Sequence, residues 1–328
     1  MPCALPDDLP WRALLAANDL VKDGARALAL ILRENWECAP DARAVPADAR
    51  SVLLIEVEDG AVDDALAATA DAVCGLDERG LAEVRPRPGA RLDPGIATAA
   101  RVYLPVILGA ARARRAGRCF VAGHVTQTID GRIACENGQS QWIGNTADLH
   151  HSHRMRALLE GVMVGANTAL QDNPKLDVRH VEGPDPRRVV ISGRGRALRE
   201  GRDLQLLQAP GCEVFVAEGA PIMDAPEAAS VRRIQASGAA LDPAAVLRSL
   251  EEIGVQSVYL EGGAGVLSSF LQAGAIDLLQ VHIASMVLGS GLPSLRFPAV
   301  DHVDDGLHLH VDHAILDDHV LLTCRPRA

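Results

Sequence analysis

The clearest chemical signal in the sequence is a glycine-rich turn within residues 257–274, SVYLEGGAGVLSSFLQAG. A strand is expected to end at Glu261, and Gly263 and Gly265 would then let the backbone approach a ligand closely. The helix that follows would present free N–H groups and a partial positive charge, which suits a phosphate. The pattern is an incomplete dinucleotide fingerprint, because Ser268 stands at the third glycine position. A tight turn that needs glycine only for its geometry is the alternative.

Charged and hydroxyl side chains follow two other expected strands. RRVVIS is followed by GRGR, which places Arg194 and Arg196 near a strand's carboxyl end. Open α/β sheets bind ligands at that edge, and a cation there favours the 2′-phosphate of NADPH, with a solvated turn as the alternative. VGANTALQDNPKLDVR offers Thr168 at a helix start, with Asp172 and Arg179 beyond it. These two charges either face one pocket or form an exposed ion pair.

A tryptophan lies in an otherwise polar loop at the end of TIDGRIACENGQSQWIG, residues 128–144. Aromatic residues make up only 3% of the chain, and a core tryptophan is expected inside an apolar run. Trp142 instead has glutamine on one side and Ser140 just before that glutamine. Its position therefore needs an explanation other than core packing.

The elements that would hold these residues alternate along the second part of the chain. We expect strands at FVAGHVTQTI, GVMVG, RRVVIS, CEVFVA, QSVYLE and LLQVHIASMVL, with helices at 145–160, 243–254 and 264–274. Asn145 and Asp148 resemble a capping box at the first of these helices. The C-terminal stretch LHLHVDHAILDDHVLLTCR is expected to form an antiparallel hairpin. The predicted fold class is α/β, a mostly parallel sheet with helices on both faces and a C-terminal hairpin.

The first part of the chain reads as a smaller α/β segment. Residues 11–33 have helical periodicity, residues 51–57 indicate a buried strand, and residues 61–74 indicate a helix. The apolar stretch 102–110 contains a proline and indicates a buried helix or strand. Residues 111–118, ARARRAGR, read as a linker or helix end, and we place the domain boundary there.

Composition narrows the class of protein. The 328 residues are 48% hydrophobic, and the formal net charge is −11. An acidic surface repels phosphate backbones, so we expect no nucleic-acid partner. No run of eighteen apolar residues and no signal peptide are visible, so we expect no membrane association and a cytoplasmic location. The seven cysteines lack any C-x-x-C pair, which favours packed thiols over disulfides or a zinc site.

Taken together, five motifs resemble the reductase domain of riboflavin biosynthesis: TIDGRIA, SQWI, RMRALLEGVMVGANT, DNPKLDVR and EGGAGVL. The resemblance covers about residues 119–328 and implies a dihydrofolate-reductase-like fold. It implies a reductase that uses NADPH on a phosphoribosylaminopyrimidine, such as 5-amino-6-(5-phosphoribosylamino)uracil. Hydride transfer to the sugar C1′, through an imine form, would open the ribose to a ribityl chain.

The same resemblance assigns roles to residues. Arg156 and Arg179 would hold the substrate phosphate, Glu261 would orient or protonate the opening sugar, and the indole of Trp142 would form a wall of the cofactor site. The substrate-binding set is Ser140, Arg156, Leu176, Arg179 and Glu261. The cofactor-binding set is Gln127, Trp142, Thr168, Asp172, Ser192, Gly193, Gly263, Ala264, Gly265, Val266, Leu267, Ser268 and Ser269.

Two departures from the family pattern qualify this expectation. Relatives commonly carry a lysine where this chain has His124, which could bond to the substrate or donate a proton near pH 7. Bifunctional relatives carry a preceding zinc deaminase, but residues 1–118 contain no histidine, so we expect no deaminase there. We also expect no bound metal, although His150, His151 and His153 crowd one helix and His308 and His310 share a strand.

Three functions remain open from the sequence. The first is the pyrimidine reductase, acting on a small-molecule substrate. The second is a dihydropterin reductase on the same fold, because His124 loosens the assignment of the substrate. The third is a non-catalytic nucleotide-binding or scaffold protein. We expect a homodimer, because the C-terminal hairpin offers a sheet edge that needs to be covered.

Overall fold

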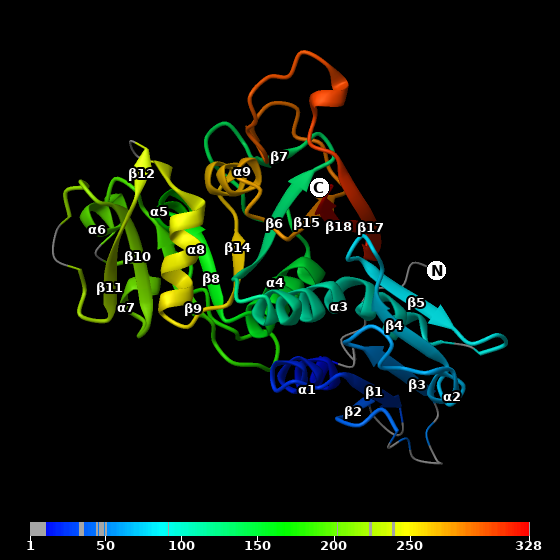
Figure 1. Cartoon of the computed structure of the whole chain (residues 1–328). Helices are drawn as coiled ribbons and strands as arrows, with labels where there is room; N and C mark the ends of the chain where they lie inside the picture. The colour runs from blue at the N-terminus through cyan, green and yellow to red at the C-terminus, as the bar shows by residue number, and fades with distance from the viewer. Residues whose placement is uncertain are drawn as a thin grey trace.

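A computed structural model of the chain describes residues 11–327, apart from 33–35, 44, 46–48, 50, 91, 202, 223–224 and 238–239. Two sheets lie one above the other, with helices between them (Figure 1). The larger, nine-stranded sheet is built by the second part of the chain. The smaller, five-stranded sheet is built by the first part.

The nine-stranded sheet has the order β11-β10-β9-β8-β14-β6-β15-β18-β17. Every pairing from β11 to β15 is parallel, and only the pairings made by β18 are antiparallel. The predicted mostly parallel sheet with a C-terminal hairpin is therefore confirmed. Its strands are β6 (Phe120–Thr128), β8 (Gly161–Gly165), β9 (Arg187–Ile191), β10 (Cys212–Ala217), β11 (Ala229–Ile234), β14 (Ser257–Glu261), β15 (Leu278–Ala284), β17 (Leu309–Leu316) and β18 (His319–Pro326).

Helices cover both faces of this sheet, as adjacent residues of β6 show. His124 faces the ring of His151 on helix α4, at a centroid distance of 5.4 Å, while a Cβ on Gly123 would meet Leu267 of helix α9. Neighbouring strand residues point to opposite faces, so α4 and α9 lie on opposite sides. The helices of this part are α4 (Thr146–Leu158), α5 (Ala166–Asp172), α6 (Arg196–Glu200), α7 (Gln205–Gln208), α8 (Pro243–Glu252) and α9 (Ala264–Gln272).

The N-terminal sheet has the order β2-β1-β3-β4-β5, with one parallel pairing between β3 and β4. Its strands are β1 (Ala27–Leu32), β2 (Trp36–Ala39), β3 (Ser51–Glu56), β4 (Ala72–Leu76) and β5 (Ala82–Pro86). The helices of this part are α1 (Trp11–Lys22), α2 (Asp64–Ala67) and α3 (Pro94–Arg115). The expected strand at 51–57 is confirmed.

Two expected N-terminal helices are wrong in extent. The helix predicted for 11–33 ends at Lys22, because Gly24 takes a φ of +97° and the next residues pair as strand β1, while Arg33 lies outside the described residues. The helix predicted for 61–74 is only the short α2, and its last residues form β4. In both cases an apolar run that is compatible with a helix is instead a buried strand.

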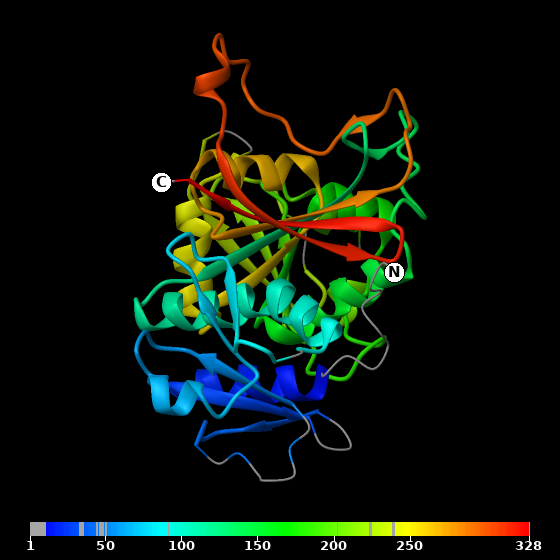
Figure 2. The same cartoon turned by 90° about the vertical axis from the view of Figure 1, so that its right-hand side faces the viewer.

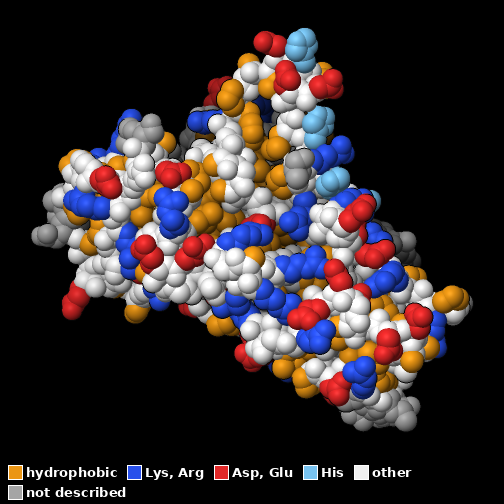
Figure 3. Space-filling view, viewed as in Figure 1, with side chains coloured by type: hydrophobic (Ala, Val, Ile, Leu, Met, Phe, Trp, Pro, Cys, Tyr) orange, Lys and Arg blue, Asp and Glu red, His pale blue; other side chains and the backbone are white. Residues whose placement is uncertain are grey.

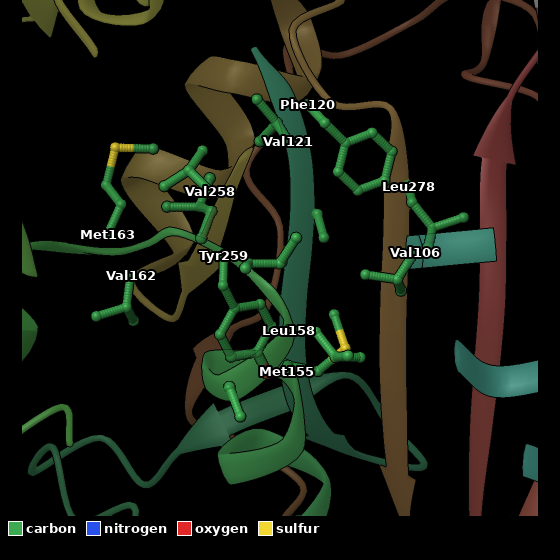
Figure 4. Packing of buried hydrophobic residues seen from close by; sticks show 14 of the residues in the cluster. Val106, Phe120, Val121, Met155, Leu158, Val162, Met163, Val258, Tyr259 and Leu278 are labelled. Atoms are coloured by element: carbon green, nitrogen blue, oxygen red, sulfur yellow. The ribbon is translucent and has the colours of Figure 1, made fainter. Parts of the chain in front are cut away.

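Helix α3 joins the two sheets into one apolar core. It begins at Pro94, where the carboxylate of Asp93 accepts the N–H of Ile96, and its last turn carries three arginines. The expected buried element at 102–110 and the helix end at 111–118 both belong to it. Its buried residues share one continuous cluster with β4, β6 and β15. Figure 4 shows part of this core, with side chains that come from α3 (Val106), β6 (Phe120), α4 (Met155) and β14 (Tyr259).

Polar contacts also tie the first part of the chain to the second. The Tyr103 hydroxyl lies 3.3 Å from Nδ1 of His151, and the Gln280 side chain donates to the Val102 carbonyl at 3.1 Å. On α1, Trp11 donates from its indole to the Glu182 carbonyl at 2.7 Å. These bonds satisfy polar groups at a buried boundary, so the two parts are packed together rather than linked loosely.

A long connection between β15 and β17 extends beyond the larger sheet (Figure 2). It contains β16 (Leu292–Pro293), which pairs with β7 (Arg132–Ala134), and the 3-10 turn η1 (Val303–Asp305). A further small pair, β12 (Ala236–Ser237) and β13 (Ala240–Leu241), follows β11. The β7–β16 pairing holds this connection beside the loop that carries Trp142.

The surface of the protein carries charges of both signs, and its longest apolar helix is packed inside the protein. Acidic and basic side chains are interspersed over the face seen in Figure 3. Within the described part of the chain, α3 alone is long and apolar enough to cross a membrane, and 72% of its most apolar window is buried inside the protein. Such burial is typical of a core helix.

The close packing of α3 on β6 gives a stability prediction. A Cβ on Gly109 would lie 2.7 Å from the Phe120 ring, whose surroundings are fully packed. We expect Gly109→Val to lower the free energy of unfolding by about 2 kcal/mol through overpacking, measured by urea denaturation. Gly219→Val is the matched control, because no atom lies within 4 Å of that position. Equal stability of the two variants would contradict the packing described here.

Candidate active site

A cleft crosses the carboxyl ends of five adjacent strands of the larger sheet. It consists of three hollows that share lining residues, which we name inner, middle and outer. The inner hollow, about 420 Å³, lies over β6 and β14; the middle one, about 440 Å³, over β8 and β9; the outer one, about 540 Å³, beside β10. Five strands about 4.8 Å apart span roughly 19 Å, which accommodates an extended ligand. Parallel sheets bind ligands at this edge.

The N-terminus of α9 forms a cradle where the inner and middle hollows meet. Gly263 caps the helix with a φ of +77°, and no side chain bonds to the first-turn N–H groups. A Cβ on Gly263 would lie 3.2 Å from the Thr168 hydroxyl, whereas one on Gly265 would meet nothing within 4 Å. The backbone is therefore exposed to the cleft with uncapped donors. This arrangement fits a phosphate or pyrophosphate group.

The inner hollow brings His124 and Glu261 together. Their strands pair in parallel register, with Glu261 opposite His124, so both side chains point to the face that carries α4. Arg156 on α4 donates to both oxygens of Glu261, from Nε at 2.6 Å and Nη2 at 2.8 Å. The arginine side chain is 10% exposed. This buried two-bond pair fixes Glu261 as an acceptor.

Asp148 lies on the other side of His124 and is the most strongly perturbed acid of the site. Its Oδ1 is 3.4 Å from Nε2 of His124 and 3.3 Å from Nδ1 of His282, and its Oδ2 accepts the Thr126 hydroxyl at 2.7 Å. Burial alone would raise its pKa, but the two histidines and Thr126 hold the pKa of Asp148 well below its usual range. Asp148 is therefore an ionised carboxylate between two imidazoles.

The buried histidines beside Asp148 are held neutral. Burial lowers the pKa of His282 to about 4, although the Asp148 carboxylate opposes this change. Burial also lowers the pKa of His151 well below its usual value. His151 bonds to Tyr103 on one side and lies 3.0 Å from the Gln280 side chain on the other. Within the described residues no group of three His, Cys, Asp or Glu could hold a metal ion.

The predicted substrate residues are only partly gathered at the inner hollow. Ser140 and Glu261 line it. Arg156 lies behind Glu261 and also donates to the Asp177 carbonyl at 3.1 Å. Arg179 pairs with the Asp177 carboxylate and remains half-exposed. Leu176 is fully buried in the left-handed conformation, with φ at +54°, so only its backbone could meet a ligand.

Most of the predicted cofactor residues line the cleft, and four of them (Gln127, Trp142, Leu267 and Ser268) do not. Thr168, Asp172, Gly263, Ala264 and Gly265 line the inner hollow, and burial raises the pKa of Asp172. The middle hollow is lined by Ser192, Gly193, Val266 and Ser269, with Arg194 and Arg196. Leu267 and Ser268 instead point into the core, where the Ser268 hydroxyl accepts the Arg296 N–H at 2.8 Å. Gln127 does not line either hollow.

The position of Trp142 differs from the expectation. Its indole is 87% exposed and does not line the cleft, whereas the neighbouring Ser140 and Ile143 do. A φ of +70° at Trp142 turns its side chain outward. Such a conformation is costly for a bulky residue and is frequent at ligand-binding loops.

Sequence reasoning missed several lining residues of the inner hollow. Asp148 was interpreted as a helix-capping residue, and only the Asn145 half of that cap is present. Its carboxylate faces the hollow instead. Arg296 arrives from the long connection after β15, and no local pattern signals it. Three further polar residues were missed: Asn167 and Gln171 are adjacent to the predicted Thr168 and Asp172 on α5, and Ser152 lies about one turn before Arg156 on α4.

The fold and the cleft define an α/β protein with a ligand-sized cleft at the carboxyl edge of a mostly parallel sheet, as the sequence implied. The chain belongs to the family described as the RibD C-terminal domain, whose model matches residues 120–312. The riboflavin biosynthesis protein RibD of Corynebacterium ammoniagenes is 35% identical over 183 residues, 53% of this chain and 47% of that protein. The chain thus spans about half the length of that relative.

Two further matches cover different shares of the chain. The 2,5-diamino-6-ribosylamino-4(3H)-pyrimidinone 5′-phosphate reductase of Methanothermobacter thermautotrophicus is 33% identical over 176 residues, 52% of this chain and 80% of that protein. A deaminase/reductase structure from Thermotoga maritima matches 97% of this chain and 99% of its own, with a TM-score of 0.61 and 22% identity. The likeness in fold therefore includes the N-terminal part, but at that identity it concerns fold alone.

The neutral buried histidines predict how stability depends on pH. A histidine whose pKa is lower in the folded than in the unfolded state takes up a proton on unfolding, so its contribution is lost as the pH falls. For His282 the window runs from about pH 6.5 to about pH 4. Within it we expect the free energy of unfolding to fall by about 1.4 kcal/mol per pH unit for each such histidine.

Urea denaturation at a series of pH values between 7.5 and 4.5 measures this slope. His282→Asn is expected to give a shallower slope, by the contribution of one histidine. His313→Asn, on the exposed face of the C-terminal hairpin, serves as the control. A stability that stays constant between pH 6.5 and 4.5 would show that these imidazoles are not held neutral.

Proposed function

We propose that the protein reduces a ribosylaminopyrimidine 5′-phosphate with NADPH, converting the ribose to a ribityl chain in riboflavin biosynthesis or a related pathway. One observation carries the proposal: the uncapped α9 N-terminus and the His124–Glu261 pair share a single hollow at the sheet's carboxyl edge. A phosphate cradle beside acid–base side chains suits a dinucleotide-dependent reduction. The 2,5-diamino-6-ribosylamino-4(3H)-pyrimidinone 5′-phosphate reductase among the relatives supports the same reaction class.

The cleft suits an extended dinucleotide. Thr168, Gly263 and Gly265 would hold the phosphates, and Ser192 and Gly193 would flank the adenosine half over β9. Arg196 is already bonded to Glu200 and Asn167, whereas the side chain of Arg194 forms no ion pair with the described residues. Arg194 is thus the cation available for a 2′-phosphate. A bound NADPH would supply the hydride.

The substrate would occupy the inner hollow against His124, Ser140 and Glu261. Arg156 donates two hydrogen bonds to the Glu261 carboxylate. We therefore propose that it positions Glu261 and does not bind the substrate phosphate directly. For the substrate phosphate we assign the exposed Arg296, which lines the hollow, and Arg179, which pairs with Asp177. The protein's tasks are to orient the sugar, exclude water and provide one proton.

The remaining expectations belong to the same proposal. We divide the chain at residues 1–118 and 119–328 and assign no zinc deaminase to the first part, which contains no histidine to bind the metal. We propose a homodimer because β17 is an edge strand of the larger sheet and exposes Val311. We also propose a cytoplasmic location.

Turnover assays test the proposed reaction. NADPH oxidation is followed at 340 nm with a ribosylaminopyrimidine 5′-phosphate and, separately, with a dihydropterin. We expect turnover with the first substrate alone, and Gly265→Val to weaken NADPH binding by at least about tenfold, because the new side chain occupies the ligand's space rather than the protein's. Turnover with the dihydropterin instead would select that alternative. Binding of NADPH without turnover of either substrate would favour a non-catalytic role.

The free cation of the middle hollow predicts cofactor preference. We expect Arg194→Ser to lower the ratio of kcat/KM for NADPH over NADH by about tenfold or more, mainly through KM for NADPH, since a charge-assisted contact to the 2′-phosphate is lost. Arg233→Ser, on the edge strand β11 and bonded to the carbonyls of Glu218 and Ala220, is the control. An unchanged preference would show that Arg194 does not meet the 2′-phosphate.

A further inference from the structure

A row of titratable side chains leads from the inner hollow to the protein surface. Nε2 of His124 lies 3.4 Å from Oδ1 of Asp148, and the same oxygen lies 3.3 Å from Nδ1 of His282. Nε2 of His282 is 2.7 Å from Nδ1 of His319, and Nε2 of His319 is 3.7 Å from Oδ1 of Asp318. We call these five side chains, drawn from β6, α4, β15, β18 and the hairpin turn, the histidine row.

The two ends of the histidine row differ in exposure. His124 lines the inner hollow and is otherwise buried, His282 has no exposed surface, and His319 is 7% exposed. Asp318 lies in the turn between β17 and β18 with 71% of its side chain exposed, where it accepts the Ser285 hydroxyl at 2.8 Å. The row therefore connects the hollow with solvent through an otherwise packed interior.

Packing alone does not account for these residues. Polar side chains in an apolar core cost free energy unless they are fully bonded. Yet Nε2 of His124, Oδ1 of Asp148 and Nδ1 of His282 have no hydrogen-bond partner of good geometry among the described residues, although Oδ1 of Asp148 lies 3.4 Å from the first nitrogen and 3.3 Å from the second. Aliphatic residues at these positions would satisfy the core better. The row is a polar path maintained at a cost to stability.

We propose that the histidine row is a proton path that recharges His124 from solvent during the reduction, a role that rests on the proposed function. His124 is then the catalytic acid, and Asp148, His282, His319 and Asp318 position it and return its proton. Sequence position cannot reveal this role, because the five residues are separated by up to 195 positions along the chain (124 to 319).

The chemical step balances with one proton and one hydride. As the sugar C1′–O4′ bond breaks, O4′ leaves with the bonding electron pair and takes a proton from the imidazolium of His124. C1′ gains a hydride and is reduced, the two electrons being those that reduced nicotinamide supplies when bound, and that cofactor is oxidised. His124 is left neutral and regains its proton along the row from water at Asp318.

The other groups that face His124 are poor proton donors, so we assign the role of donor to His124. From β14, Glu261 is bonded at both oxygens to Arg156, and burial raises the pKa of Tyr259 well above its usual value. From α4, Asp148 is ionised and His151 is neutral. From β15, Gln280 carries no proton to give, and His282 is neutral with both ring nitrogens in the row. A neutral imidazole accepts a proton at one nitrogen and releases one at the other without moving.

The test compares His282→Asn with His313→Asn. The asparagine can still donate to Asp148 from the position of Nδ1 but has no second nitrogen to pass a proton on. At low buffer concentration we expect kcat to fall at least about tenfold, with KM for NADPH and substrate unchanged. Added imidazole should restore kcat in proportion to its concentration, and the solvent deuterium isotope effect on kcat should rise. His313→Asn, on an exposed hairpin position, should behave as the wild type.

Two further measurements keep the outcome decisive if His282→Asn does not fold, as judged by circular dichroism. Asp318→Asn changes only the exposed end and should show the same buffer dependence. In the unliganded protein with ¹⁵N-labelled histidine, the His282 ring should be neutral at pH 7, and a charged ring would overturn the path. If these variants have the wild-type kcat and show no buffer dependence, the proton path is overturned but the proposed function is not. Absence of turnover by the wild type would overturn the proposed function.

Discussion

The parallel pairing of β14 with β6 is the constraint on which the candidate site depends. Its register sets Glu261 beside His124 on one face and ends both strands at the same edge. The glycines after Glu261 then begin α9 directly over the hollow. A slip of one residue would turn Glu261 to the opposite face and away from Arg156. Register therefore fixes acid–base groups and phosphate cradle together, which is why one short segment carries so much of the predicted chemistry.

The rigid support for this edge comes from both parts of the chain. Helix α4 brings Arg156, Asp148 and His151 to the sheet, and α3 closes the same face behind them. Because α3 belongs in sequence to the N-terminal part, that part buries the core of the larger sheet and positions His151 indirectly. The N-terminal part can therefore be required for the shape of the site. The common apolar core gives a physical reason for the two parts to remain in one chain.

Electrostatics divide the roles of the buried polar groups. The guanidinium of Arg156 fixes Glu261 as a carboxylate, while the two imidazoles and Thr126 keep Asp148 ionised. Burial holds His151 and His282 neutral. An ionised Asp148, the Arg156-bonded Glu261 and two neutral rings thus surround His124. Burying these polar groups costs desolvation free energy, which is common at a functional site.

The sequence by itself determined the alternation of strands and helices after residue 119, the C-terminal hairpin and the glycine-rich turn, because periodicity and turn chemistry are local. It also located residues that line the cleft, such as Thr168 and Gly265. It misjudged residues 23–32 and 61–74, where short apolar runs are compatible with either helix or strand. Only the tertiary structure decided that Arg156 is bonded to Glu261, that Asp148 faces two histidines, and that the indole of Trp142 points outward. Those facts depend on which strands are neighbours and on a single backbone torsion, neither of which is encoded in local pattern.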